Sequence, residues 1–143
     1  MRRRLALAVV LLATGAPAVA HAADLTGTRR ADHISGGPGD DRIRGRAGND
    51  TLLGNGGNDA LFGDAGRDRL EGGAGNDTLL GGAGADRIDG GPGADLVIGG
   101  RGNDTILVRD GTRDRVTCGP GRDTVSADRS DRVGRDCEVV RRG

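Results

Sequence analysis

The sequence predicts an all-β protein built as a right-handed parallel β-solenoid, with two nine-residue units in each coil of 18 residues. Three observations support this fold class. An aspartate recurs every nine residues without slippage, a large aliphatic residue stands two positions after each aspartate, and a glycine stands five positions before it. A fixed short repeat of this kind is typical of solenoids, whose units bury their apolar side chains by stacking on one another.

Nine such units fill residues 27–107 without a gap, in the pattern GGxGxDxUx, where U is a large aliphatic residue. The glycine-rich first half of each unit predicts a turn, because glycine and asparagine tolerate positive φ. The last three residues, such as Thr51, Leu52 and Leu53, predict a very short strand. Side chains alternate along a strand, so we expect one aliphatic residue per strand to point inward. The aliphatic residues are Ile34, Ile43, Leu52, Leu61, Leu70, Leu79, Ile88, Val97 and Ile106.

Residues 1–22 are predicted to be a secretory signal peptide rather than part of the fold. Three arginines at residues 2–4 precede a short apolar run, and an Ala-His-Ala sequence at residues 20–22 forms a small-x-small cleavage site. The mature chain would then begin at Ala23. The apolar run is shorter than the ~20 residues of a membrane-spanning helix, so no membrane span is expected; an uncleaved anchor is the alternative. We therefore expect a secreted, extracellular protein.

The repeat weakens after residue 107. One residue, Val108, is predicted to be an insertion, after which the frame resumes in degenerate units that hold Asp114, Asp123 and Asp131. Repeat proteins use atypical terminal units as caps. Residues 108–143 are therefore expected to form degenerate coils and a capping tail behind a repeat domain at residues 23–107.

The two cysteines of the chain, Cys118 and Cys137, both lie in this C-terminal segment. In an exported protein they can pair, and the closed loop would stabilise the fold by ~3 kcal/mol on the chain-entropy model. Two free thiols are the alternative. A bridge between them would hold the tail over the open end of the solenoid.

Composition and charge exclude several classes of protein. The chain has 29 glycines, no tryptophan or tyrosine and one phenylalanine, which excludes an ordinary aromatic-rich core. It has no lysine, and residues 27–107 carry nine arginines against twelve aspartates and one glutamate. That balance is neither basic nor aromatic enough for a nucleic-acid-binding protein. The sequence contains no recognisable catalytic constellation, so no enzymatic activity is expected.

Stacked coils would bring the aspartates of units i and i+2 close together. At ~5 Å two carboxylates repel by ~1 kcal/mol in water and by ~3 kcal/mol at an effective dielectric constant of about 20. A hard divalent cation removes that repulsion, and calcium takes roughly 6–8 oxygens from carboxylates and carbonyls in a tolerant geometry. Magnesium requires stricter octahedra and retains water, whereas zinc favours histidine or cysteine ligands. The repeats therefore predict calcium binding.

The units at residues 36–44 (GGPGDDRIR) and 72–80 (GGAGNDTLL) resemble the RTX (repeat-in-toxin, hemolysin-type) calcium-binding nonapeptides. The resemblance implies a parallel β-roll with calcium held between the loops of successive coils, by loop carbonyls and the sixth-position aspartates. These aspartates are Asp32, Asp41, Asp50, Asp59, Asp68, Asp77, Asp86, Asp95 and Asp104. If each ion bridges units i and i+2, the nine units hold at most about seven calcium ions (Ca2+). The first unit departs from the pattern because it lacks the inner glycines, and Arg46, Asn55 and Asp64 replace the second glycine in three others.

The ninth residue of each unit is expected to face outward. On one side of the solenoid this places Phe62, Leu80 and Ile98 on consecutive coils, as an apolar stripe that is a candidate interaction face. The alternatives are that the tail covers the stripe, or that solvent tolerates it. The sequence thus predicts a secreted protein that folds on binding calcium. The alternative function is calcium-dependent cell-surface or matrix adhesion, by self-association or with a cell-surface partner.

Overall fold

The computed structural model describes residues 22–143, so the predicted signal peptide lies outside the described residues except for its last residue. This part of the chain is all-β and contains no helix that could cross a membrane. Its strands are β1 (Asp24–Thr26), β2 (His33–Ser35), β3 (Arg42–Ala47), β4 (Thr51–Gly56), β5 (Ala60–Ala65), β6 (Arg69–Ala74), β7 (Thr78–Ala83), β8 (Arg87–Asp89), β9 (Leu96–Arg101), β10 (Thr105–Val108), β11 (Arg115–Thr117), β12 (Thr124–Ala127), β13 (Arg132–Val133) and β14 (Val139–Arg142).

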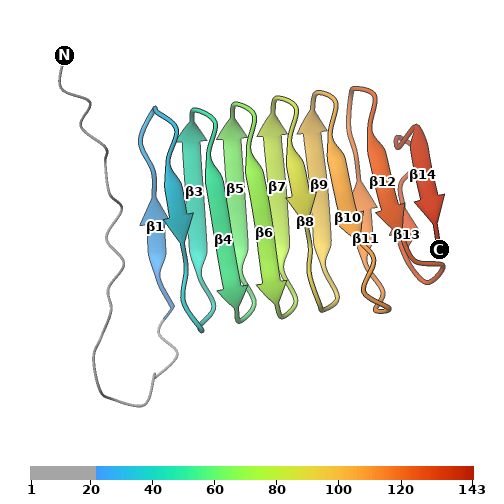
Figure 1. Ribbon diagram of the computed structural model, residues 1–143, viewed down its shortest axis with the longest axis horizontal. Coiled ribbons are helices and arrows are strands. Elements are labelled where there is room, and N and C mark those ends of the chain that lie inside the picture. The colour runs from blue at the N-terminus through green and yellow to red at the C-terminus, as the bar shows by residue number, and fades with distance from the viewer. Residues whose placement is uncertain (1–21) are drawn as a thin grey trace.

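The strands form two seven-stranded parallel sheets, one from the odd-numbered and one from the even-numbered strands. We call them the odd sheet and the even sheet. The chain alternates between the two sheets, so that neighbours within a sheet are one coil apart; Leu52 of β4, for example, pairs with Leu70 of β6. Figure 1 shows the coils stacked from β1 at one end to β14 at the other, with odd and even strands running in opposite directions. The predicted fold class, a parallel β-solenoid with 18 residues per coil, is confirmed.

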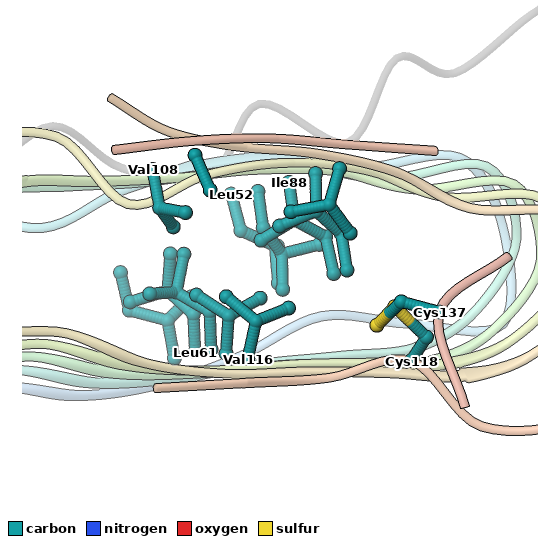
Figure 2. Close-up of a cluster of buried hydrophobic side chains, with 14 of the residues drawn as sticks. Leu52, Leu61, Ile88, Val108, Val116, Cys118 and Cys137 are labelled. Atoms are coloured by element: carbon teal, nitrogen blue, oxygen red, sulfur yellow. A yellow bond between two sulfur atoms is a disulfide. The ribbon is translucent and has the colours of Figure 1, made fainter. Parts of the chain in front are cut away.

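The core is a double row of aliphatic side chains between the two sheets. The nine predicted inward-facing aliphatics are all buried, from Ile34 at 3% exposed to Ile106 at 0%. Figure 2 shows these side chains projecting toward one another from the two sheets. Each coil contributes one residue to each row, and the core can therefore be continuous only while the coils remain in register.

Six of the strands, β3 to β7 and β9, have six residues each, twice the three predicted from the repeat. They comprise the last three residues of one unit and the first three of the next, as in Thr51–Gly56 of β4. The alternation of side chains continues across the unit boundary: Leu52 is buried, Leu53 is half-buried and Gly54 is buried again. The opening glycine of each unit consequently faces the interior.

Val108 is not an insertion, contrary to the prediction. It is the last residue of β10, pairs with Ala127 of β12 and is 1% exposed. Because Leu107 pairs with Asp89, Val108 stands level with Gly90, the opening glycine one coil earlier. The additional residue lies in the turn that follows Val108. A turn accommodates an extra residue without loss of pairing, whereas one in a strand would exchange its inner and outer faces.

The last coils close the C-terminal end of the core. β13 pairs with β11 and β14 pairs with β12, so both sheets continue beyond the regular repeats. Cys118 and Cys137 form a disulfide with an S–S distance of 1.99 Å, which lies beside the aliphatic rows in Figure 2. The disulfide attaches the final segment of the chain to the coil beneath it.

Candidate metal centre

The sixth-position aspartates point into the solenoid at the turn that precedes each strand. An aspartate stands two residues before the inward-facing aliphatic, and the alternation of side chains places both on the same face. From Asp41 to Asp104 these residues are only 1–3% exposed. They form two columns, one beside each sheet. The odd-sheet column is Asp41, Asp59, Asp77, Asp95, Asp114 and Asp131, and the even-sheet column is Asp32, Asp50, Asp68, Asp86, Asp104 and Asp123.

One carboxylate oxygen of each aspartate connects successive coils. The backbone N–H of Asp59 donates to Asp77 Oδ1 at 2.7 Å, and the N–H of Asp77 donates in turn to Asp95 Oδ1 at 2.8 Å. The same bond recurs up both columns. Charge-assisted bonds of this type hold each carboxylate in one orientation, so the second oxygen of each aspartate also has a fixed direction.

That second oxygen lacks a donor in most of the columns. Within residues 22–143, the buried Oδ2 atoms without a hydrogen-bond partner belong to Asp50, Asp59, Asp68, Asp77, Asp86, Asp95, Asp104, Asp114 and Asp123. A buried acceptor without a partner costs about 1–3 kcal/mol, and a charged one costs more. An array of such oxygens needs positive charge or protons to be stable.

The opening glycines show what these oxygens face. A Cβ atom built on Gly81 would lie 2.6 Å from Asp86 Oδ2 and 2.5 Å from the carbonyl oxygen of Gly99, one coil on. A Cβ built on Gly45 would likewise meet Asp50 Oδ2 and Gly63 O. In the regular units only glycine fits at this position, and a carboxylate oxygen and a carbonyl oxygen converge beside it. Oxygens of these two kinds are the ligands that calcium prefers.

The raised pKa values of the aspartates in the columns also indicate that positive charge would stabilise them. Burial, together with repulsion from neighbouring carboxylates, raises the pKa of Asp59, Asp68 and Asp104 to about 6 and that of Asp95 to about 7. The backbone N–H bonds to Oδ1 oppose this effect only in part. Carboxylates so disfavoured as anions are ones that a cation would stabilise.

The first two predicted ligands differ from the rest. Asp32 Oδ2 accepts hydrogen bonds from the N–H and Oγ1 of Thr28, at 2.6 and 2.9 Å. Asp41 Oδ2 accepts one from the Gly37 N–H at 2.6 Å. Gly37 lacks the positive φ of later second-position residues such as Gly73 (102°). The structure therefore aligns all nine predicted aspartates in columns, but only seven of them have a buried Oδ2 without a hydrogen-bond partner.

The predicted ligand set omits two buried aspartates of the degenerate coils, Asp114 and Asp123. Both are 0% exposed, and both continue the columns: Asp95 N–H donates to Asp114 Oδ1 at 2.8 Å and Asp104 N–H donates to Asp123 Oδ1 at 2.7 Å. Both could have been found from the sequence, because the repeat resumes imperfectly after residue 107 and an aspartate again stands two residues before a valine.

A second ladder runs along the outside of the turns and was not predicted. The Asn76 N–H donates to Asn58 Oδ1 at 2.8 Å, and the Ala94 N–H donates to Asn76 Oδ1 at 2.8 Å. Asn49 and Asn103 accept the equivalent bonds in other coils. The recurrence of asparagine at the fifth position was the signal for this ladder, which fixes the spacing of successive loops.

The three replacements of the second glycine keep the conformation of the turn. Arg46, Asn55 and Asp64 have φ values of 83°, 80° and 71°, the only positive values at non-glycine residues among residues 22–143. Two are supported locally: Asn55 Nδ2 donates to Gly36 O at 3.0 Å, and Asp64 pairs with Arg44 at 3.3 Å. These loops retain the backbone path that the glycine loops have.

No group of three or more His, Cys, Asp or Glu side chains is close enough to hold a metal ion within the part of the chain that the structure describes. Each coil adds only one carboxylate to a column. A cation there would therefore combine carboxylates of neighbouring coils with backbone carbonyls, a ligand set that suits calcium.

A parallel solenoid with two internal columns of buried, partner-free carboxylates defines a cation-binding repeat protein. The family model of the RTX calcium-binding nonapeptide repeat, which comprises four copies, matches the chain at residues 26–61, 35–70, 53–88, 62–97 and 71–106. These matches span more than half of the sequence, and the chain belongs to this family. No curated protein matches the chain.

Proposed function

We propose that this protein is a secreted calcium-binding repeat protein whose solenoid folds as its aspartate columns take up calcium. The observation that carries the proposal is the array of buried Asp Oδ2 atoms that have no hydrogen-bond donor within residues 22–143. Membership of the calcium-binding family identifies the ion, and the carbonyl oxygens that converge beside the opening glycines supply further ligands of the same kind.

Folding and binding are one event in this proposal. The unfolded chain solvates its aspartates, whereas the folded chain buries them in columns, where neighbouring carboxylates repel one another. At neutral pH the apo fold therefore bears a cost that grows with each added coil. Bound calcium offsets this cost and stabilises the folded state by mass action. Asp86 and its neighbours thus make stability depend on the calcium concentration.

The proposed location follows from two features of the chain. The predicted leader at residues 1–22 would direct export, and the Cys118–Cys137 disulfide is of a kind that persists in oxidising compartments. Expression of the full chain, followed by N-terminal sequencing of protein from the medium, tests this part. Mature protein beginning at Ala23 would support export, and retention of the uncleaved chain in cells would contradict it.

A calcium titration followed by circular dichroism and calorimetry tests the main proposal. We expect a coil-like far-UV spectrum in chelator, a β spectrum with calcium, and heat of binding that develops together with the spectral change. Magnesium at the same concentration is the control and should be much less effective, since it dehydrates reluctantly and demands octahedral geometry. Identical spectra in chelator and in calcium would rule out coupled folding.

A second candidate function is calcium-dependent adhesion through the outer face of the odd sheet. There Phe62 pairs with Leu80, and Leu80 pairs with Ile98, so the predicted apolar stripe lies on three adjacent strands. All three side chains are half-buried, and Leu96 beside them is 39% exposed. The tail strand β14 joins the even sheet and not this face. A contiguous apolar face of this kind can bind a partner.

The even sheet offers a matched control for this second candidate. At the positions equivalent to the stripe it carries Leu53, Glu71, Asp89 and Leu107, so its leucines are separated by acidic residues. We expect F62D/L80D to abolish calcium-dependent sedimentation changes and retention on cell envelopes, and L53D/L107D to leave both intact. Equal behaviour of the two double variants would argue against a role for the odd-sheet face.

A further inference from the structure

The family match ends at residue 106, but the aspartate columns do not. Asp114 and Asp123, in the coils that follow, are 0% exposed, and the Oδ2 atom of each has no hydrogen-bond partner within residues 22–143. This is the property that marks the interior members of the columns. Two fully buried carboxylate oxygens therefore lack a partner in coils that the repeat pattern does not cover.

Each of these aspartates has a carboxylate neighbour on both sides in its column. Asp95 N–H donates to Asp114 Oδ1 at 2.8 Å, and Asp114 N–H donates to Asp131 Oδ1 at 3.1 Å. In the other column, Asp123 follows Asp104 in the same way, and its N–H donates to Glu138 Oε2 at 2.8 Å. Asp131 and Glu138 thus occupy the next position in each column, and neither column ends at Asp114 or Asp123.

The opening residues of these coils are not glycines, but the carbonyl ligand does not depend on the side chain. A Cβ built on Gly99 would lie 2.6 Å from Asp104 Oδ2 and 2.8 Å from the carbonyl oxygen of Cys118. The backbone of Cys118, which opens a degenerate unit, therefore presents its oxygen to Asp104 in the coil before it, as the opening glycines do in the regular units.

The first aspartate of each column and the last aspartate of the odd-sheet column already have an N–H donor at Oδ2. At the first end, Asp32 Oδ2 accepts from Thr28 and Asp41 Oδ2 accepts from Gly37. At the other end, Asp131 Oδ2 accepts from the Asp128 N–H at 2.6 Å. An Oδ2 atom that accepts an N–H bond already has a partner for its negative charge and needs a cation less than a buried, partner-free oxygen does, so we assign these residues as caps of the columns.

We propose that Asp114 and Asp123 are calcium ligands and that Asp32 and Asp41 are not. The set of metal-binding aspartates then runs from Asp50 to Asp123, two units beyond the set that the repeat pattern indicates. This inference rests on the proposed calcium binding and adds to it the assignment of the ligands. The degenerate coils become part of the metal-binding body, and the first coil becomes a cap.

Calcium stoichiometry of three variants and of wild type tests the assignment in the disulfide-bonded mature chain. Asp→Asn substitution preserves the acceptor for the inter-coil N–H and removes the charge. We expect D114N/D123N to bind fewer calcium ions than wild type, as D86N does in the middle of the column. D32N/D41N is the matched control, with the same change in charge, and should bind the wild-type number.

Several results would overturn the assignment. Loss of ions from D32N/D41N, or wild-type stoichiometry in D114N/D123N alongside a loss in D86N, would contradict it while leaving calcium binding intact. Failure of wild type to bind any calcium would instead reject the proposed function itself. Should D114N/D123N not fold, amide NMR of wild type loaded with gadolinium decides the question. If the assignment is right, the amide signals of Cys118 and Gly119 are broadened and that of Thr28 is not. Broadening of Thr28 without broadening of Cys118 and Gly119 would exclude metal sites in the last coils.

Discussion

The backbone N–H of Asp68 donates to Asp86 Oδ1 at 2.8 Å, while the other carboxylate oxygen of Asp86 meets no donor. The two oxygens of one side chain therefore have separate tasks. One joins two coils, and the other is available to a cation. Because the tasks fall on different atoms, substitutions can separate them.

Substitution of Asp86 by asparagine is expected to weaken calcium binding and to stabilise the calcium-free fold. The asparagine carbonyl can still accept the Asp68 N–H, and its amide replaces the partner-free oxygen on the side where Gly99 O converges. Removal of one buried, partner-free acceptor should stabilise the apo state by about 1–3 kcal/mol. Urea unfolding in chelator and in calcium measures both effects.

Asp40→Asn is the control for that substitution. Asp40 is exposed, and its Oδ1 accepts the Asn58 N–H at 2.6 Å in the outer ladder, where asparagine is the usual residue. The variant removes one negative charge near the columns and leaves every carboxylate of the columns in place. Equal effects of D86N and D40N on calcium affinity would mean that net charge, and not ligation, is responsible.

The stability of the calcium-free protein should increase as the pH falls from about 7 to about 4. Burial raises the pKa of Asp95 to about 7 and that of Asp59 to about 6, above the ordinary value of 3.8. For a carboxyl whose pKa is raised by folding, the stabilisation is complete below the unfolded pKa and is lost as pH rises through the folded pKa. Protonation then substitutes for the missing cation.

Circular dichroism of protein freed from calcium by gel filtration, between pH 4 and pH 8, measures this dependence. We expect β structure to be gained on acidification without calcium. With calcium present the dependence should reverse, because protons compete for the same oxygens and calcium affinity should decrease at low pH. Loss of structure on acidification in the absence of calcium would contradict the burial of charged aspartates.

Two adjacent glycines in one turn should respond oppositely to alanine. Gly57 has a φ of 113°, and a Cβ there would lie 2.6 Å from Gly39 O, so G57A should destabilise the calcium-loaded protein by more than about 1 kcal/mol. A Cβ on Gly56 would have Ala74 O as its nearest neighbour, at 3.9 Å. G56A should therefore be neutral or stabilise by about 0.4–1 kcal/mol.

Urea denaturation in saturating calcium compares the two alanine variants under identical conditions. Alanine is the natural residue at the position of Gly56 in the units that contain Ala47, Ala65 and Ala74, which supports the expected tolerance. If G57A matched G56A in midpoint, the close approach of successive turns at the fourth position would be incorrect.

The periodic positions were predictable because one rule of geometry governs them all. A nine-residue period with an inward-facing residue at position eight also determines positions six and one, since alternation places Asp50, Leu52 and Gly54 in the interior. The period cannot show which oxygen of Asp50 is engaged. That depends on hydrogen bonds between residues 18 positions apart, such as the one from the Asp32 N–H.

The ends of the solenoid were the least predictable from sequence. The hydrogen bond from the Gly37 N–H to Asp41 Oδ2 depends on the φ angle of Gly37. Because glycine adopts positive and negative φ with equal ease, the sequence does not determine that angle. The role of Val108 depends on where the chain absorbs one extra residue, and the sequence alone fits either the strand or the turn. Local patterns describe the interior of a repeat protein well, but its caps are set by tertiary contacts.

Reduction of the Cys118–Cys137 disulfide should release the C-terminal tail and raise the calcium concentration needed for folding. The bridge connects the coil of Cys118 to the segment whose Asp136 Oδ2 accepts the Cys118 and Gly119 N–H groups at 3.0 and 2.8 Å. Without it, the loss of chain-entropy stabilisation is about 3 kcal/mol. We expect a lower unfolding temperature, and faster tryptic cleavage after the exposed Arg135.

Limited trypsin digestion in calcium, with and without a phosphine reductant, measures the release of the tail. A variant with serine at both cysteines is the control, since it should be cut quickly under both conditions and should not respond to the reductant. A different result is expected if tertiary contacts, and not the disulfide, hold the tail in place. If Glu138, which accepts the Asp123 N–H, and β14 held the segment in place, the reduced wild type would resist trypsin as well as the oxidised protein does. That outcome would assign the cap to hydrogen bonding and show that the disulfide is dispensable for closing the core.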